Sequence, residues 1–270
     1  MISLKQVFDF YLRSSLHVAF SVYALVRMTH FMFNIISDEP IANFAFLGTI
    51  VGYNFVKYDA LARAKKRTMR SELKLIALLS SISLFGVGYY FFKLQLITQV
   101  VSVAVLALTL LYTLPFFPNR KNARNWAGVK IYIVALCWVG VTLVLPLVNA
   151  HVALGNDFFL KCIQRFILVF VLILIFEIID MANDDPHLQT VPQQVGTRNT
   201  KIIGLLLLIP FYFLEFFKYK FIAEQLIVNG ILVAILSLFL ALANEKRSTY
   251  YTSFWVESIP IIWWLMVVFF

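Results

Sequence analysis

The chain has 270 residues, of which 61% are hydrophobic and 14% are charged, and its formal net charge is +9. Soluble domains are usually about 45–50% apolar, so this composition excludes an ordinary soluble protein and favours one embedded in lipid. Backbone groups inside a bilayer must bond to one another, which leaves helices or a closed barrel as spanning structures. The apolar runs do not alternate with a period of two residues, so we expect an all-α integral membrane protein.

The excess of Lys and Arg does not indicate binding of nucleic acid. These residues form short clusters between the apolar runs rather than one continuous basic surface. Such clusters are typical of the cytoplasmic loops of membrane proteins. We therefore expect the lipid bilayer, and no nucleic acid, as a partner.

Nine apolar runs follow a short amphipathic segment over residues 1–13. They cover residues 14–34, 41–57, 73–92, 95–114, 128–148, 162–182, 201–217, 221–243 and 252–270. No connection between them is long enough to hold a soluble domain. The expected fold is a nine-transmembrane-helix bundle, with residues 1–270 forming a single polytopic membrane domain.

The positive charges indicate an orientation for this bundle. With the N-terminus in the cytoplasm, 17 of the 23 Lys and Arg residues lie on the cytoplasmic side and five lie outside. Positively charged loops tend to remain in the cytoplasm. We therefore expect a multi-pass protein of the cell inner membrane, with its C-terminus on the side opposite to the N-terminus.

The second run ends in a charged segment that contains Asn54, Lys57, Asp59 and Arg63 and continues into a basic loop with Arg67. A helix advances about 100° per residue, so Asn54 and Asp59 would lie about 140° apart around a continuous helix. Asp59 and Arg63 are four residues apart and can form an ion pair worth about 0.2–0.5 kcal/mol. One interpretation is therefore a charged helix end without a further role.

The sixth run ends in the most informative segment, Glu177-Ile-Ile-Asp180-Met-Ala-Asn-Asp184. On a helix these three acids fall within about 60° of one another. Carboxylates placed together at membrane depth repel one another, and a divalent cation relieves that repulsion. Mg²⁺ commonly takes one or two carboxylates and fills its other positions with water and phosphate oxygens. A solvated helix end and an ion or proton pathway are the alternatives.

This acidic segment, with the Gln189-Thr190-Val191-Pro192 turn and Gly196 that follow it, resembles the second aspartate motif of the UbiA superfamily of intramembrane prenyltransferases. That motif reads D-x-x-D-x-x-x-D and is followed by a Thr-Leu-Pro-like turn and a Gly; here Glu177 replaces the first aspartate. The resemblance implies nine transmembrane helices and Mg²⁺-dependent transfer of a prenyl chain. The implied donor is a prenyl diphosphate, and the implied acceptor is hydrophobic and often aromatic.

The resemblance also implies a second acidic motif, N-x-x-x-D-x-x-x-D, at the end of the second helix. Here the spacing from Asn54 to Asp59 is five residues, and Arg63 stands where another aspartate is expected. One of the two usual metal sites is therefore expected to be weakened or lost, with basic groups balancing the diphosphate charge instead.

The resemblance assigns roles to residues of both motifs and of the basic loops. Asp180, Asp184, Asn54 and Asp59 are the expected catalytic residues, and together with Glu177 they are the expected metal ligands. Substrate binding is expected from Lys57, Arg63, Arg67, Tyr112, Lys121, Arg124, Arg198 and Lys201. The alternative function is a degenerate family member that binds an isoprenoid or another lipid without catalysis.

Overall fold

The fold is taken from a computed structural model of the whole chain. It describes residues 3–36, 38–63, 71–113, 128–181, 188–219 and 222–270, and only the backbone of residues 59–63 and 112–113. The described residues form helices and no strand, which confirms the all-α expectation.

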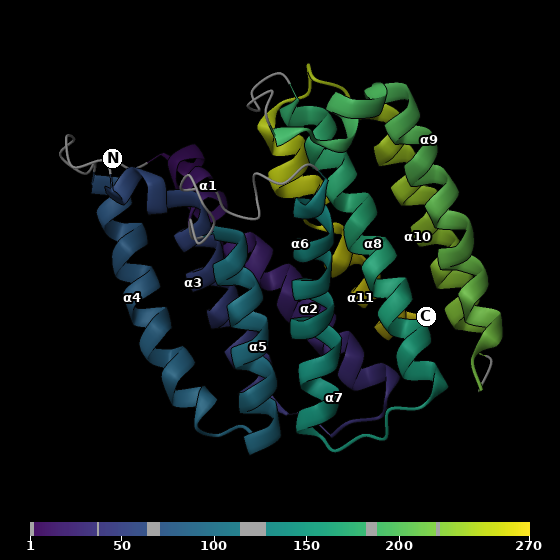
Figure 1. The fold of residues 1–270 in the computed structure, drawn as a ribbon, viewed down its shortest axis with the longest axis horizontal. Coiled ribbons are helices and arrows are strands. Elements are labelled where there is room, and N and C mark those ends of the chain that lie inside the picture. The colour runs from purple at the N-terminus through teal and green to yellow at the C-terminus, as the bar shows by residue number, and fades with distance from the viewer. Residues whose placement is uncertain (1–2, 37, 64–70, 114–127, 182–187, 220–221) are drawn as a thin grey trace.

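The helices stand side by side with their long axes roughly parallel, except for the short helix α1, which lies near one end (Figure 1). In chain order they are α1 (Leu4–Arg13), α2 (Leu16–Met32), α3 (Glu39–Arg63), α4 (Ser71–Phe91), α5 (Leu96–Thr113), α6 (Val129–Val139), the π-helix η3 (Gly140–Val144), α7 (Leu145–Asn149), α8 (Asn156–Asp180), α9 (Val191–Phe213), the 3₁₀ turn η5 (Leu214–Phe217), α10 (Ala223–Leu242), the π-helix η6 (Tyr251–Val256) and α11 (Ile259–Phe269).

Six of the described segments are long and apolar enough to cross a membrane. They are Ser71–Phe91, Val129–Asn149, Asn156–Asp180, Val191–Phe217, Ala223–Leu242 and Tyr251–Phe269; the apolar segment Leu96–Leu111 is shorter. A multi-pass helical protein is therefore confirmed, whereas the count of nine spans stays a prediction.

Large apolar side chains cover much of the outer surface of the bundle. Phe85 is 83% exposed, Phe92 is 80% exposed and Leu96 is 75% exposed. Extended exposure of such side chains is unfavourable in water and costs nothing against lipid tails. The surface therefore agrees with the hydropathy in placing these helices in a bilayer.

Helix α1 is joined to α2 by a corner that a side chain of α3 stabilises. Ser15 at this corner has a left-handed backbone with a φ of 63°. Its Oγ donates to Asn54 Oδ1 at 2.8 Å, and Asn54 Nδ2 donates to the Ser14 carbonyl at 3.0 Å and to Ser80 Oγ at 2.9 Å. Asn54 thus connects the α1–α2 corner, α3 and α4.

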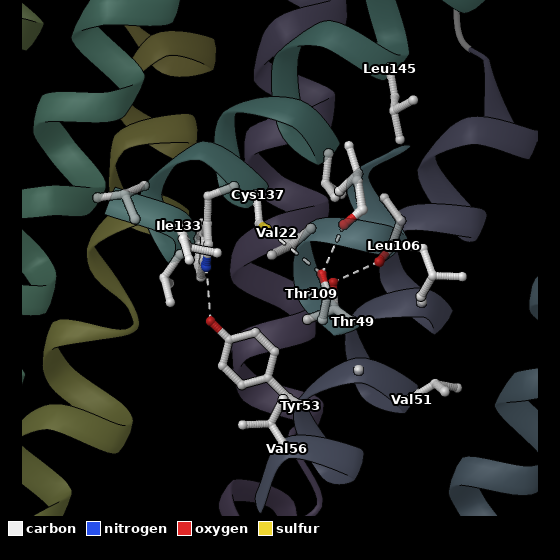
Figure 2. A pocket seen from close by; sticks show the side chains of 18 of the residues that line it. Val22, Thr49, Val51, Tyr53, Val56, Leu106, Thr109, Ile133, Cys137 and Leu145 are labelled. Atoms are coloured by element: carbon white, nitrogen blue, oxygen red, sulfur yellow. Dashed lines mark hydrogen bonds between the residues drawn. The ribbon is translucent and has the colours of Figure 1, made fainter. Parts of the chain in front are cut away.

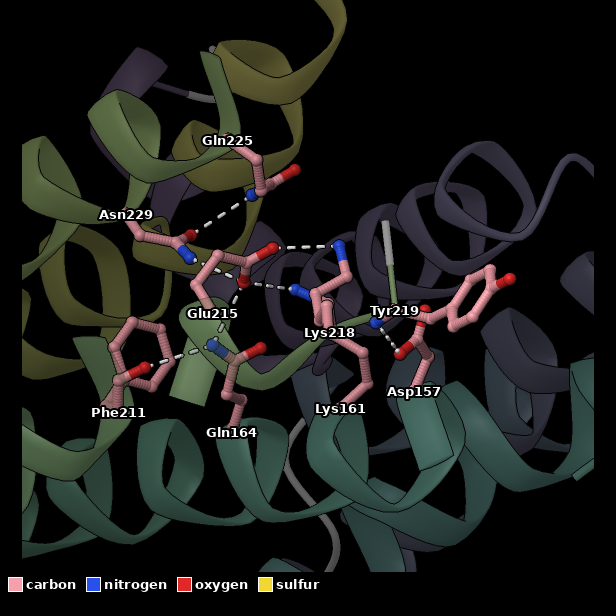
Figure 3. A network of polar contacts seen from close by, with 9 residues as sticks. All are labelled: Asp157, Lys161, Gln164, Phe211, Glu215, Lys218, Tyr219, Gln225 and Asn229. Carbon is pink, nitrogen blue, oxygen red and sulfur yellow. Dashed lines mark hydrogen bonds and ion pairs between the residues drawn. The ribbon is translucent and has the colours of Figure 1, made fainter. Parts of the chain in front are cut away.

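Helix α8 lies within the bundle, between α6 on one side and α9 and α10 on the other (Figure 1). The first turns of α8 carry polar residues. These residues lie against groups of α9, η5 and α10 (Figure 3). Glu215 Oε2 accepts from Lys161 Nζ at 2.8 Å and from Asn229 Nδ2 at 3.0 Å, and Glu215 Oε1 accepts from Lys218 Nζ at 2.8 Å. Each charge in this buried group therefore has a partner, which makes its burial tolerable.

Candidate functional site

An apolar cavity of about 530 Å³ lies between α3, α4, α5, α6 and α8. Figure 2 shows its wall, which includes Val22, Thr49, Tyr53, Leu106 and Cys137. The wall follows from helix periodicity, because lining residues of α3 recur at three- and four-residue intervals. On α3 they include Ala45, Gly48, Thr49, Gly52, Tyr53 and Val56.

The polar groups of the wall are engaged by neighbouring protein atoms. Thr49 Oγ1 donates to the Ala45 carbonyl at 2.7 Å, and Thr109 Oγ1 donates to the Val105 carbonyl at 3.1 Å. These hydroxyls satisfy carbonyls of their own helices, so they do not make the cavity hydrophilic. The wall suits a hydrocarbon ligand.

Charged side chains line the cavity at the end where α6 begins and α8 ends. They are Lys130 at the start of α6 and Asp180 at the end of α8; Glu257, just before α11, also lines the cavity. All three are partly exposed. A cavity with an apolar body and charges at one end fits an amphiphile that has a polar head and a hydrocarbon tail.

Asp180 is where the sequence placed it, at the end of a long apolar helix, and it is a cavity residue. Asp184, the other expected aspartate ligand, lies outside the described residues. Asp59 belongs to the last turns of α3 at the same end of the bundle, and only its backbone is described.

Glu177 is only 3% exposed and connects three elements. Its Oε1 lies 3.9 Å from Lys130 Nζ, and its Oε2 accepts from the Val191 backbone N–H at 3.1 Å. Val191 begins α9, where free N–H groups favour a negative partner. Glu177 therefore joins the ends of α8 and α6 to the start of α9, and it is absent from the residues that line the cavity.

The turn after the acidic segment has the local structure that its residues favour. The Thr190 N–H donates to Gln193 Oε1 at 3.0 Å, and Pro192 occupies the first turn of α9. Gly196 has a φ of 80° and a ψ of 156°, a conformation open essentially to glycine alone. This Gly therefore allows the capped turn to bend before the rest of α9 continues.

The expected ligand Asn54 and the basic residue Lys57 point toward the α1–α2 corner. Asn54 is 3% exposed, and its amide is engaged by Ser14, Ser15 and Ser80 as described above. Lys57 Nζ donates to Ser15 Oγ at 3.1 Å. Asn54 is not among the residues that line the cavity.

The remaining expected binding residues divide into two sets. Lys201 Nζ donates to the Ala241 carbonyl at 2.8 Å, near the end of α10, and Arg198 is exposed on α9; neither lines the cavity. The structure gives no side-chain description for the others, which are Arg63, Arg67, Tyr112, Lys121 and Arg124.

The described residues contain no group of three or more His, Cys, Asp or Glu side chains that could hold a metal ion. Mg²⁺ does not require such a group, since one or two carboxylates suffice when phosphate oxygens complete its coordination. The described donor that fits is the Asp180 carboxylate, a hard oxygen ligand at the charged end of the cavity. The donor set is thus compatible with Mg²⁺.

Glu257 was not expected from the sequence. It stands alone in an apolar and aromatic segment, so no spacing motif marks it. A single acid inside an apolar run is itself a signal of function, because such residues are expensive in a membrane. That signal could have identified Glu257.

Comparison with known proteins identifies solved structures that share this fold. No protein-family model matches the sequence, and no curated protein matches it significantly. Among solved structures, the apo structure of a UbiA homolog from Aeropyrum pernix K1 superposes with a TM-score of 0.65 at 16% identity, covering 93% of this chain and 97% of that chain. A structure of digeranylgeranylglyceryl phosphate synthase superposes with a TM-score of 0.57 at 14% identity, covering 98% of this chain and 96% of that chain.

The protein is an integral multi-pass membrane protein of the helical class. It shares its fold with the UbiA homolog and with digeranylgeranylglyceryl phosphate synthase, which agrees with the resemblance carried by the acidic segment and its turn. At these identities the superpositions establish the shared fold, and the activity is a separate question.

Proposed function

We propose that this protein is a prenyltransferase that moves a prenyl chain from a prenyl diphosphate to a hydrophobic acceptor within the membrane. The observation that carries the proposal is the apolar cavity of about 530 Å³ with Lys130 and Asp180 at one end, inside a UbiA-like fold. The hydrocarbon chain would lie among the apolar wall residues. The diphosphate would lie at the charged end.

Asp180 would hold Mg²⁺ in this proposal, with Asp184 and Asp59 as further carboxylates from the two sequence motifs. The ion would neutralise charge that gathers on the diphosphate as the bond to the prenyl chain breaks. Lys130 would add positive charge from α6. Glu177 would position this region through its contacts with Lys130 and Val191.

The altered first motif predicts a low rate of prenyl transfer. Two metal ions clamp a diphosphate better than one, and Arg63 replaces a carboxylate of the first site. The Asn54 amide is also engaged within the protein. We therefore expect slow transfer, with binding of the diphosphate retained. A non-catalytic isoprenoid-binding protein is the second candidate, and the same altered motif favours it.

Incubation of purified protein with radiolabelled farnesyl or geranylgeranyl diphosphate, Mg²⁺ and a panel of aromatic acceptors tests the proposal. Slow, Mg²⁺-dependent formation of prenylated product is expected, and Arg63→Asp should increase the rate. Saturable retention of label without product, in both proteins and with every acceptor, would favour the second candidate. Neither product nor retention would contradict the proposed function.

A further inference from the structure

Glu257 provides a carboxylate to the cavity from the turn between η6 and α11, which neither acidic motif includes. It is partly exposed and belongs to the cavity lining together with Val256 and Pro260. Within the part of the chain that the structure describes, its carboxylate oxygens have no hydrogen bond and no ion pair within 4.0 Å. A carboxylate in an apolar cavity is unfavourable unless a partner satisfies it.

The backbone that presents Glu257 is held in place from two helices. Glu257 follows the π-helix η6, and its N–H donates to the Thr252 carbonyl at 3.1 Å. The Ser21 hydroxyl of α2 donates to the Glu257 carbonyl. One residue further on, Ser258 Oγ pairs with His17 Nε2 at 3.0 Å. Single π turns occur frequently at functional sites, where they redirect a side chain.

The charges around Glu257 distinguish it from the proposed diphosphate site. Lys57 on α3 lies near enough for its charge to attract the Glu257 carboxylate, although its Nζ donates to Ser15 Oγ instead. Asp180 also lines the cavity, but it comes from the end of α8. A cation bound at Asp180 would satisfy that carboxylate and leave Glu257 as an acceptor of hydrogen bonds.

We propose that Glu257 binds a hydrogen-bond donor of the acceptor substrate, so that the acceptor carries a hydroxyl or N–H group on an apolar body. This inference rests on the proposed function. An ionised carboxylate only accepts hydrogen bonds, and it repels an anionic group placed against it. The cavity around Glu257 is apolar, which suits the body of such an acceptor.

Two probes that differ only in the donor test this inference. Binding of tritiated 4-hexylphenol and 4-hexylanisole to the purified protein in detergent is measured by equilibrium dialysis, in the presence of Mg²⁺. The proteins compared are the wild type, Glu257→Gln, Glu257→Ala and Glu245→Gln, which changes an exposed carboxylate outside the cavity. Binding of geranylgeranyl diphosphate is measured in parallel.

The wild type and Glu245→Gln should prefer the phenol by about tenfold, as expected for a hydrogen bond to a charged acceptor. Glu257→Gln should reduce that preference and Glu257→Ala should abolish it, while both still bind the anisole and the diphosphate. The inference is overturned if the wild type shows no preference or if both Glu257 variants keep it. If the wild type prefers the phenol but does not bind geranylgeranyl diphosphate, that result would instead contradict the proposed function.

Discussion

Trp138 and Tyr53 join α6 to α3 at the wall of the cavity. The indole Nε1 of Trp138 donates to the Tyr53 hydroxyl at 2.8 Å, and both side chains line the cavity (Figure 2). Aromatic pairs that are hydrogen-bonded in this way have few alternative rotamers. The pair therefore fixes the space between the two helices, and with it the room available to a hydrocarbon chain.

Replacing Trp138 by Ala should shift the preference of the protein toward longer prenyl diphosphates. Removing the indole opens space in the wall, and each added methylene of a ligand can then be buried. The ratio of the dissociation constants for farnesyl and geranylgeranyl diphosphate should change by about tenfold in favour of the longer chain. Tyr132→Ala is the matched control, because Tyr132 lies on the same helix and is 52% exposed. An equal shift in both variants would contradict the role given to Trp138.

Glu215 should be essential for stability. It is fully buried and balances both Lys161 and Lys218, so Glu215→Gln would leave the buried Lys161 and the partly exposed Lys218 without their carboxylate (Figure 3). Breaking a buried pair in this way costs about 3–5 kcal/mol. The free energy of unfolding can be measured by titrating SDS into mixed micelles. Glu224→Gln, an exposed site on α10, should change it by less than about 0.5 kcal/mol. Similar losses in the two variants would show that the buried network contributes little.

Gly196 and Gly88 should respond to Ala in opposite directions. Neither position has an atom within 4 Å of a new Cβ, so steric overlap does not decide the result. Gly196 has a φ of 80°, and Gly196→Ala should cost about 1–3 kcal/mol of unfolding free energy. Gly88 lies inside α4, where Ala should add about 0.5–1 kcal/mol. The same SDS titration measures both. Stabilisation by Gly196→Ala would mean that the bend at the start of α9 is not required.

The helices could be predicted from the sequence because their signal is local. Long apolar runs specify helices in lipid, and the expected run 14–34 contains the observed helix Leu16–Met32. The amphipathic lead-in also agrees with α1. Boundaries were less accurate where a helix begins with polar residues, as α8 does at Asn156 rather than near 162. The expected run 162–182 leaves out Lys161, which is buried with Gln164 in the network around Glu215.

The site could be predicted only where one segment carries it. Asp180 lies within a local motif, and the structure places it on the cavity. The surroundings of Asn54 depend on Ser14, Ser15 and Ser80, which are distant in sequence and have no motif of their own. Glu257 is placed at the cavity by the preceding π-helix η6, a backbone feature that no residue pattern predicted. The parts of the site that could not be predicted therefore depend on contacts between segments that are distant in the sequence.

Binding of geranylgeranyl diphosphate tests the central claim most directly. Purified wild-type protein should retain the radiolabelled ligand saturably with Mg²⁺ and should lose it when EDTA is added. Asp180→Asn should weaken that retention by about tenfold or more, because the ligand carboxylate of the metal is lost. Asp157→Asn, at the opposite end of the same helix, should bind as the wild type does. Retention that is indifferent to EDTA and unchanged in Asp180→Asn would contradict the account.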